Sequence, residues 1–242
     1  MIYVLCALAA LIGLAGAWAL RRESFFWAGA LLIGALAAVA YAGATAGSGA
    51  AFRLYYALGA SMFPGWVGVG SLYLVVSRKT ARWPALLVLA LSAVQLGLTL
   101  PADVNAAALA ALNGSNGEGI LVRGGWVAPT VLFNTLGLGF AAVAAFLAWW
   151  RAFRVQQPRT AAVAIGLSVV VIGVLARSAA VYRMLTDIGA PRAFMLLDAV
   201  AFALVWAGAA LSRELPRPLA AMLGLQQVPS PAAAGEGYGE GA

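Results

Sequence analysis

The sequence predicts an all-α, polytopic membrane protein, a bundle of seven transmembrane helices with its amino terminus outside and its carboxyl terminus in the cytoplasm. Two observations predict this fold. Hydrophobic residues make up 64% of the 242 residues and charged residues only 10%, whereas a soluble domain has about half and about a quarter. Basic residues also cluster in every second gap between the apolar stretches, as they do in cytoplasmic loops.

Each apolar stretch is long enough to cross a bilayer, which takes about 17–25 helical residues. The first stretch has no basic segment before it, so we interpret it as a membrane helix and not as a secretion signal. The predicted transmembrane domain covers residues 1–213, and 214–242 form a cytoplasmic tail, predicted to be disordered from about residue 228. The predicted spans are 2–20, 25–44, 52–76, 84–101, 127–150, 161–182 and 193–212.

The basic residues predict the orientation of the bundle. One face carries Arg21, Arg22, Arg78, Lys79, Arg82, Arg151, Arg154, Arg159, Arg213 and Arg217, and the other carries Arg53, Arg123, Arg177, Arg183 and Arg192. Because basic loops stay in the cytoplasm, the first face is predicted to be cytoplasmic. The same loops explain the net charge of +7 without a nucleic-acid partner. We therefore expect a multi-pass protein of a bacterial cytoplasmic membrane.

Span three contains Pro64, which predicts a kink, and Ser61 is placed to satisfy the backbone that a proline leaves unpaired. Small residues recur at a spacing of four, as at Gly137 and Ala141, and predict close contact between helix backbones. In the extracytoplasmic segment 102–126, Asp103 is predicted to cap a short helix that lies on the membrane surface or on the protein.

Charged groups inside spans are costly in lipid and therefore informative. Asp198 lies in span seven, Arg177 near the outer end of span six and Arg53 at the outer start of span three, with Tyr56 at a similar level. One interpretation is an outward-facing pocket whose arginines receive an anionic or polar ligand. The other is an ion pair between helices that fixes their packing.

Other polar residues predict contacts within the protein. Arg183 and Asp187 are four residues apart and form a predicted local ion pair if span six continues as a helix. Gln95 in span four, and Asn134 and Thr135 in span five, are predicted to lie in the interior and to form hydrogen bonds between helices.

The sequence excludes several kinds of chemistry. The chain has no histidine, which excludes haem held by histidine. The only lysine, Lys79, lies in a loop, which excludes a covalently bound retinal. A single cysteine, Cys6, excludes a thiol–metal cluster. We therefore expect no cofactor, no metal and no catalytic residues.

At Arg53-Leu54-Tyr55-Tyr56, at Gly68-Val69-Gly70-Ser71-Leu72-Tyr73-Leu74 and at Phe133-Asn134-Thr135 the chain resembles hypothetical integral membrane proteins of bacteria with seven spans. The resemblance implies the membrane class. It implies no activity, cofactor or binding residue.

The sequence leaves more than one function open. The sparse polar interior favours a non-enzymatic protein, an accessory or scaffolding subunit of a membrane complex that binds lipid or another apolar ligand between its helices. Its partners would then be the bilayer and other membrane subunits, or further copies of itself. The alternative is a small transporter or solute-binding bundle with Arg53, Tyr56, Arg177 and Asp198 at its entrance. An enzyme acting on lipid is the third and least favoured function, because the sequence shows no nucleophile–base pair.

Overall fold

The protein is a bundle of long helices. The computed structural model describes residues 1–22, 24–112, 119–185 and 194–213. The helices are α1 (Ile2–Leu20), α2 (Phe25–Thr45), α3 (Gly49–Tyr55), η1 (Tyr56–Met62), α4 (Phe63–Val75), α5 (Arg78–Thr99), α6 (Ala106–Ala110), α7 (Val127–Val155), α8 (Pro158–Leu185) and α9 (Phe194–Leu211). The prediction of an all-α membrane-type fold is confirmed at this level.

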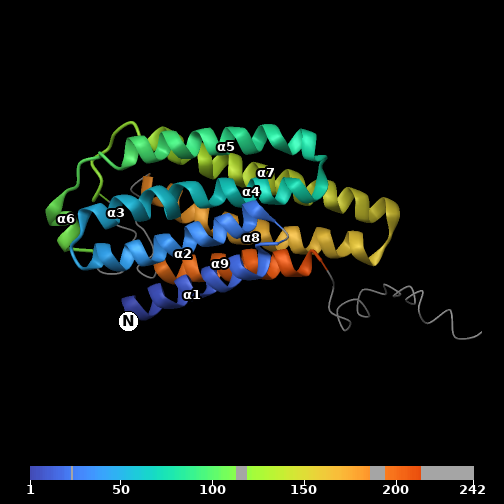
Figure 1. Ribbon diagram of the computed structural model, residues 1–242, viewed down its shortest axis with the longest axis horizontal. Coiled ribbons are helices and arrows are strands. Elements are labelled where there is room, and N and C mark those ends of the chain that lie inside the picture. The colour runs from blue at the N-terminus through green and yellow to red at the C-terminus, as the bar shows by residue number, and fades with distance from the viewer. Residues whose placement is uncertain (23, 113–118, 186–193, 214–242) are drawn as a thin grey trace, which may run out of the picture.

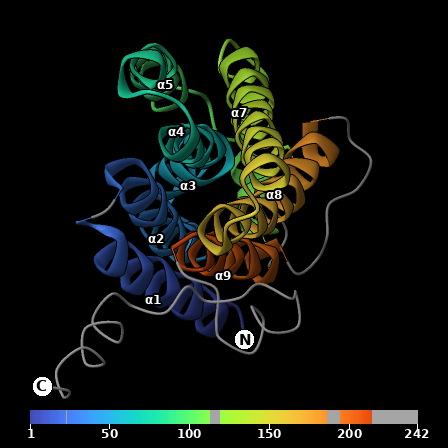
Figure 2. The ribbon, with the colours of Figure 1, turned by 90° about the vertical axis from the view of Figure 1, so that its right-hand side faces the viewer.

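The long helices run back and forth along the long axis of the bundle (Figure 1). α3, η1 and α4 form one continuous helical rod, Gly49–Val75, which we call the central rod. Figure 2, which looks along the bundle, shows this rod in the middle, with α5 and α7 on one side of it and α1 on the other. α9 contacts both α1 and α8. The central rod is the most buried of the apolar helical segments because neighbouring helices surround it.

Within the described residues, six helical segments are long and apolar enough to cross a membrane. They are α1, α2, the central rod, α5, α7 and α8. The predicted seventh span corresponds to α9, whose apolar segment Met195–Leu211 is shorter than these six. The structure therefore supports a multi-pass membrane protein, and the predicted tail 214–242 lies outside the described residues.

Glycines bring helix backbones into direct contact, as the spacing of small residues predicts. A methyl group added at Gly68 of α4 would lie 2.4 Å from the carbonyl oxygen of Gly137 of α7. A methyl group at Gly166 of α8 would lie 2.4 Å from the carbonyl oxygen of Gly208 of α9. Real Cβ atoms do not approach this closely, so only glycine allows these crossings. This is how membrane helices pack without a hydrophobic drive between them.

The predicted cap of the short helix after α5 is wrong. The side chain of Asn105, not that of Asp103, accepts hydrogen bonds from the backbone N–H groups of Ala107 and Ala108. The reason is that Val104 pairs with Leu121 in an antiparallel bridge. This pairing keeps the chain extended past Asp103 and delays the first helical turn.

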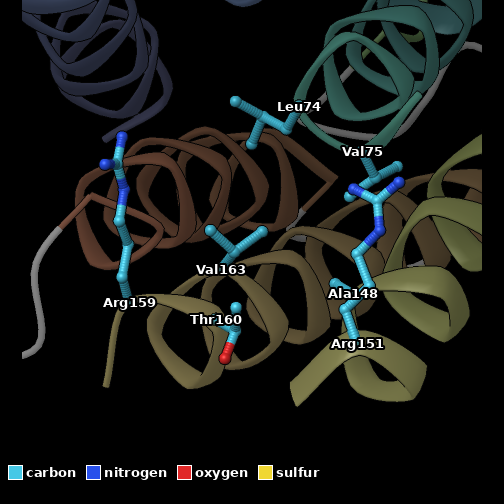
Figure 3. A pocket seen from close by; sticks show the side chains of 7 residues that line it. All are labelled: Leu74, Val75, Ala148, Arg151, Arg159, Thr160 and Val163. Carbon is cyan, nitrogen blue, oxygen red and sulfur yellow. The ribbon is translucent and has the colours of Figure 1, made fainter. Parts of the chain in front are cut away.

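The two ends of the bundle differ in charge. One end of the bundle holds the loops after α1, after the central rod and after α7, and also the end of α9 (Figure 1). These loops and the helix ends beside them carry the basic residues that were predicted to be cytoplasmic, among them Arg21, Arg78, Arg151 and Arg159, so we call this the basic end. Large aromatic side chains near it are exposed, including Trp83 at 73% and Phe153 at 72%. A cavity of about 180 Å³ opens between the ends of α4, α7 and α8 (Figure 3).

Candidate functional site

Buried polar side chains surround η1 in the bundle interior. We call this group the polar core. Its members are Ser61, Gln95, Thr99, Thr130, Asn134, Arg177 and Asp198. Each is at most 1% exposed. Polar groups buried this completely are stable only when they are hydrogen-bonded or paired, so their contacts decide what the region can do.

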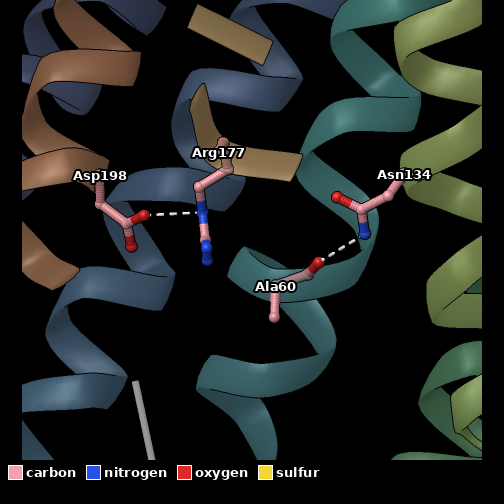
Figure 4. A network of polar contacts seen from close by, with 4 residues as sticks. All are labelled: Ala60, Asn134, Arg177 and Asp198. Carbon is pink, nitrogen blue, oxygen red and sulfur yellow. Dashed lines mark hydrogen bonds and ion pairs between the residues drawn. The ribbon is translucent and has the colours of Figure 1, made fainter. Parts of the chain in front are cut away.

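Pro64 explains one of these contacts. In a regular helix the N–H of residue 64 would donate to the carbonyl of Ala60, and proline has no N–H. Asn134 of α7 donates its Nδ2 to that carbonyl oxygen at 3.0 Å instead (Figure 4). The side chain of one helix thus replaces a backbone hydrogen bond that another helix lacks.

The turn before Pro64 is a π-helix, in which the N–H of Phe63 donates to the carbonyl of Leu58. The hydroxyl of Ser61 donates to the carbonyl of Tyr56 at 3.2 Å, and not to the carbonyl of Ala60 that Pro64 leaves unpaired, so the role predicted for Ser61 is taken by Asn134. π-helical turns are rare in proteins and are found often at functional sites. Sequence reasoning predicted a kink at Pro64 and missed the π-helix.

A cluster around the Gln95 amide joins three elements of the bundle. Its Nε2 lies 2.9 Å from the hydroxyl of Ser61 in η1, 2.9 Å from that of Thr99 in α5 and 3.1 Å from that of Thr130 in α7. The Ser61 and Thr130 hydroxyls are themselves 2.9 Å apart. These contacts hold α5 against the central rod and α7 through polar groups, since apolar packing alone has little drive in lipid.

On the other side of η1, Arg177 of α8 and Asp198 of α9 form an ion pair. The Nε of Arg177 lies 2.6 Å from Oδ1 of Asp198. Figure 4 shows the guanidinium group between this carboxylate and the central rod. The guanidinium group passes beside Gly59 of η1, where an added methyl group would lie 3.5 Å from Nη2 of Arg177, an ordinary contact, and 2.9 Å from the Cβ of Ala37 in α2. The guanidinium group also interacts with the side chain of Tyr55.

Of the four residues predicted to form an outer site, the structure brings two together, Arg177 and Asp198. Arg53 is not part of this group: its Nε donates to the carbonyl of Ala102 at 2.7 Å and ties the start of the central rod to the following loop. Tyr56 is buried, and its ring packs against Trp126 with the ring centroids 4.8 Å apart.

The predicted polar interior is found for Gln95 and Asn134 and not for Thr135. Thr135 is exposed, and its hydroxyl shares a hydrogen bond of 2.5 Å with Tyr182. Successive helical residues are about 100° apart around the axis, so one step from Asn134 leads out of the interior. The predicted pair of Arg183 and Asp187 cannot be described, because Asp187 lies outside the described residues.

Thr99 and Thr130 belong to the polar core and were missed. The signal was present in the sequence, because Thr99 lies four residues after Gln95, and Thr130 four residues before Asn134, on the same helix faces. The described residues contain no group of three or more metal-ligating side chains of the His, Cys, Asp and Glu types. The polar core offers donors and acceptors, and no nucleophile beside a base.

No protein-family model matches the chain, and no curated protein or solved structure is similar to it. The resemblance to hypothetical bacterial membrane proteins therefore stays a prediction. The function has to be argued from the geometry of the polar core and of the basic end.

Proposed function

We propose that this chain is a non-enzymatic integral membrane protein that acts as an accessory or scaffolding subunit of a membrane complex. The observation that carries the proposal is the burial of the Arg177–Asp198 pair, at 0% and 1% exposure. A pair that received a solute would need a wet path to the outside. A dry pair between α8 and α9 instead fixes two helices against each other, at the expense of desolvating both charges.

The polar core supports the same role, because its contacts are made between helices and not toward an opening. Asn134 donates to the backbone of the central rod, and Gln95 joins the rod to α5 and α7. Such contacts lock a helix arrangement. In contrast, α1 and α5 are the least buried of the candidate spans and expose apolar side chains to lipid or to another subunit.

We further propose that α9 is a seventh span and that the amino terminus lies outside a bacterial cytoplasmic membrane. α9 has 18 residues, which rise about 27 Å, close to the roughly 30 Å of a bilayer core. The basic end would then be cytoplasmic. Its exposed aromatic side chains support this placement, since such residues gather at membrane interfaces.

Two experiments test this proposal. Reporter fusions after residues 22, 80 and 156 are expected to be cytoplasmic, and periplasmic signals from them would contradict the orientation. Purification of the full chain from its native membrane in mild detergent is expected to retain other membrane subunits at constant stoichiometry. A lone monomer or homo-oligomer would contradict the subunit role.

A second candidate function is a small solute-binding or transport bundle. It is favoured by the π-helix and by two buried acceptors, Oε1 of Gln95 and Oδ1 of Asn134, that have no hydrogen-bond partner among the described residues. A solute or water with donor groups would satisfy both. Solute-dependent protection of these helices from hydrogen exchange in reconstituted protein would support this function over the first.

A further inference from the structure

We propose that the cavity at the basic end binds the phosphate group of an anionic phospholipid. The cavity is lined by Leu74, Val75, Ala148, Arg151, Arg159, Thr160 and Val163. The inference rests on the membrane location proposed above and not on the role as a subunit.

Two arginines from different helices border this cavity. Arg151 comes from the last turns of α7 and Arg159 from the first turn of α8. Figure 3 shows the two arginines on opposite sides of Val163, with both side chains extending in the same direction in this view. Each guanidinium group offers several N–H donors to an oxyanion that enters this opening.

Neither guanidinium group is neutralised within the described residues. Arg151 and Arg159 have no ion pair or hydrogen bond there, and the described acidic residues are Asp103, which follows the end of α5, and Asp198, which lies in the second turn of α9 and pairs with Arg177. The hydroxyl of Thr160 already donates to the carbonyl of Gln157 at 2.7 Å. The two arginines are therefore the donors that remain for a ligand.

The size and the walls of the cavity favour a lipid over a soluble metabolite. Its volume of about 180 Å³ is below the roughly 300–1,000 Å³ of pockets that enclose drug-sized ligands. The remaining walls are apolar, and Leu74 is exposed beside the opening. A phospholipid whose phosphate lies between the arginines would have its acyl chains along this apolar surface. Basic pockets between membrane helices on the cytoplasmic side bind anionic headgroups in this way.

The test uses the full chain in detergent with added dioleoylphosphatidylglycerol or dioleoylphosphatidylcholine, and counts retained lipid by native mass spectrometry. We expect a preference of about 30-fold for phosphatidylglycerol, which is what about 1 kcal/mol from each of two arginines gives. Arg151→Gln/Arg159→Gln should remove most of it. The matched control Arg82→Gln/Arg154→Gln takes the same charge from the same end, but neither residue lines the cavity, and it should keep the preference.

Val163→Trp is a second variant, which fills the cavity and keeps every arginine, and it should also lower the retention of phosphatidylglycerol. Circular dichroism verifies that each variant is folded. Equal loss in both charge variants would show general surface attraction and overturn the proposal. Displacement of the lipid by millimolar inorganic phosphate alone would assign the cavity to a soluble anion and also overturn it. Both results are independent of whether partner subunits co-purify.

Discussion

Arginine has opposite surroundings in two regions of this protein. In the polar core, Arg177 is fully buried and held by Asp198 at 2.6 Å. At the basic end, Arg151 and Arg159 are exposed and border a cavity without an acidic partner among the described residues. The comparison shows that depth in the bundle, and not residue type, decides what a charge does here. A buried charge destabilises the fold unless an opposite charge is paired with it, whereas an exposed charge is available to bind a ligand.

The largest effect is expected where the buried partner is removed. Asp198→Ala leaves the guanidinium of Arg177 without its carboxylate, and should lower the free energy of unfolding by about 3–5 kcal/mol. Unfolding by sodium dodecyl sulfate in mixed micelles, followed by circular dichroism, measures this. The double variant Arg177→Met/Asp198→Leu should be close to the wild type in stability. A double variant no more stable than Asp198→Ala would contradict the assigned pairing.

The second-largest loss of stability is expected at the backbone contact between α4 and α7. Gly137→Ala would place a methyl group 2.3 Å from the backbone of Pro64, and should destabilise the protein by about 1–3 kcal/mol. Gly139→Ala on the same helix is the matched control, because nothing lies within 4 Å of its added methyl group. Equal unfolding midpoints for the two variants would show that α4 and α7 do not cross at Gly137.

A smaller effect is expected at the bond that Pro64 makes necessary. Asn134→Ala removes the donor to the carbonyl of Ala60 and should cost about 0.6–2 kcal/mol. In a Pro64→Ala background, residue 64 has an N–H for that carbonyl, so the same substitution should cost less. A double-mutant cycle of unfolding free energies measures the difference. Additive effects would contradict the replacement of a backbone bond by Asn134.

The smallest effect is expected at the basic end. Arg151→Gln removes an exposed charge with no partner among the described residues, so it should change the unfolding free energy by no more than about 0.5 kcal/mol without added anionic lipid. Thermal unfolding in a neutral detergent measures this. A loss comparable to that of Asp198→Ala would show that Arg151 is a structural residue and would remove the contrast between the regions.

Much of the fold could be predicted from the sequence because lipid imposes a simple rule on it. Apolar length predicts helices that cross a membrane, and a helix lies at each predicted span, although α5, α7 and α8 extend beyond the predicted bounds and, among the described residues, only six segments are long and apolar enough to cross. The pairing of Arg177 with Asp198 was one of two interpretations, and burial favours it. The pairing could be predicted because the two residues lie at a similar depth in neighbouring spans.

The rest could not be predicted because it depends on rotation and on loop paths. Thr135 faces outward because it follows Asn134 by one step around the helix. Arg53 bonds to Ala102 because the loop after α5 returns over the start of the central rod. The π-helix over Tyr56–Met62 differs from an α-helix in which carbonyl each N–H reaches, and no residue type specifies that choice.

The central claim is that the polar core is closed to water and structural. Ser178, next to Arg177, is fully buried, and its hydroxyl has no hydrogen-bond partner among the described residues, so Ser178→Cys is nearly isosteric there. In a Cys6→Ala background in liposomes, labelling of this thiol by a water-soluble maleimide should be at least about 100-fold slower than that of an exposed control, Ala50→Cys. That ratio corresponds to an opening free energy of about 2.7 kcal/mol. Labelling at the rate of the control would show a wet path to the ion pair, and would contradict the account.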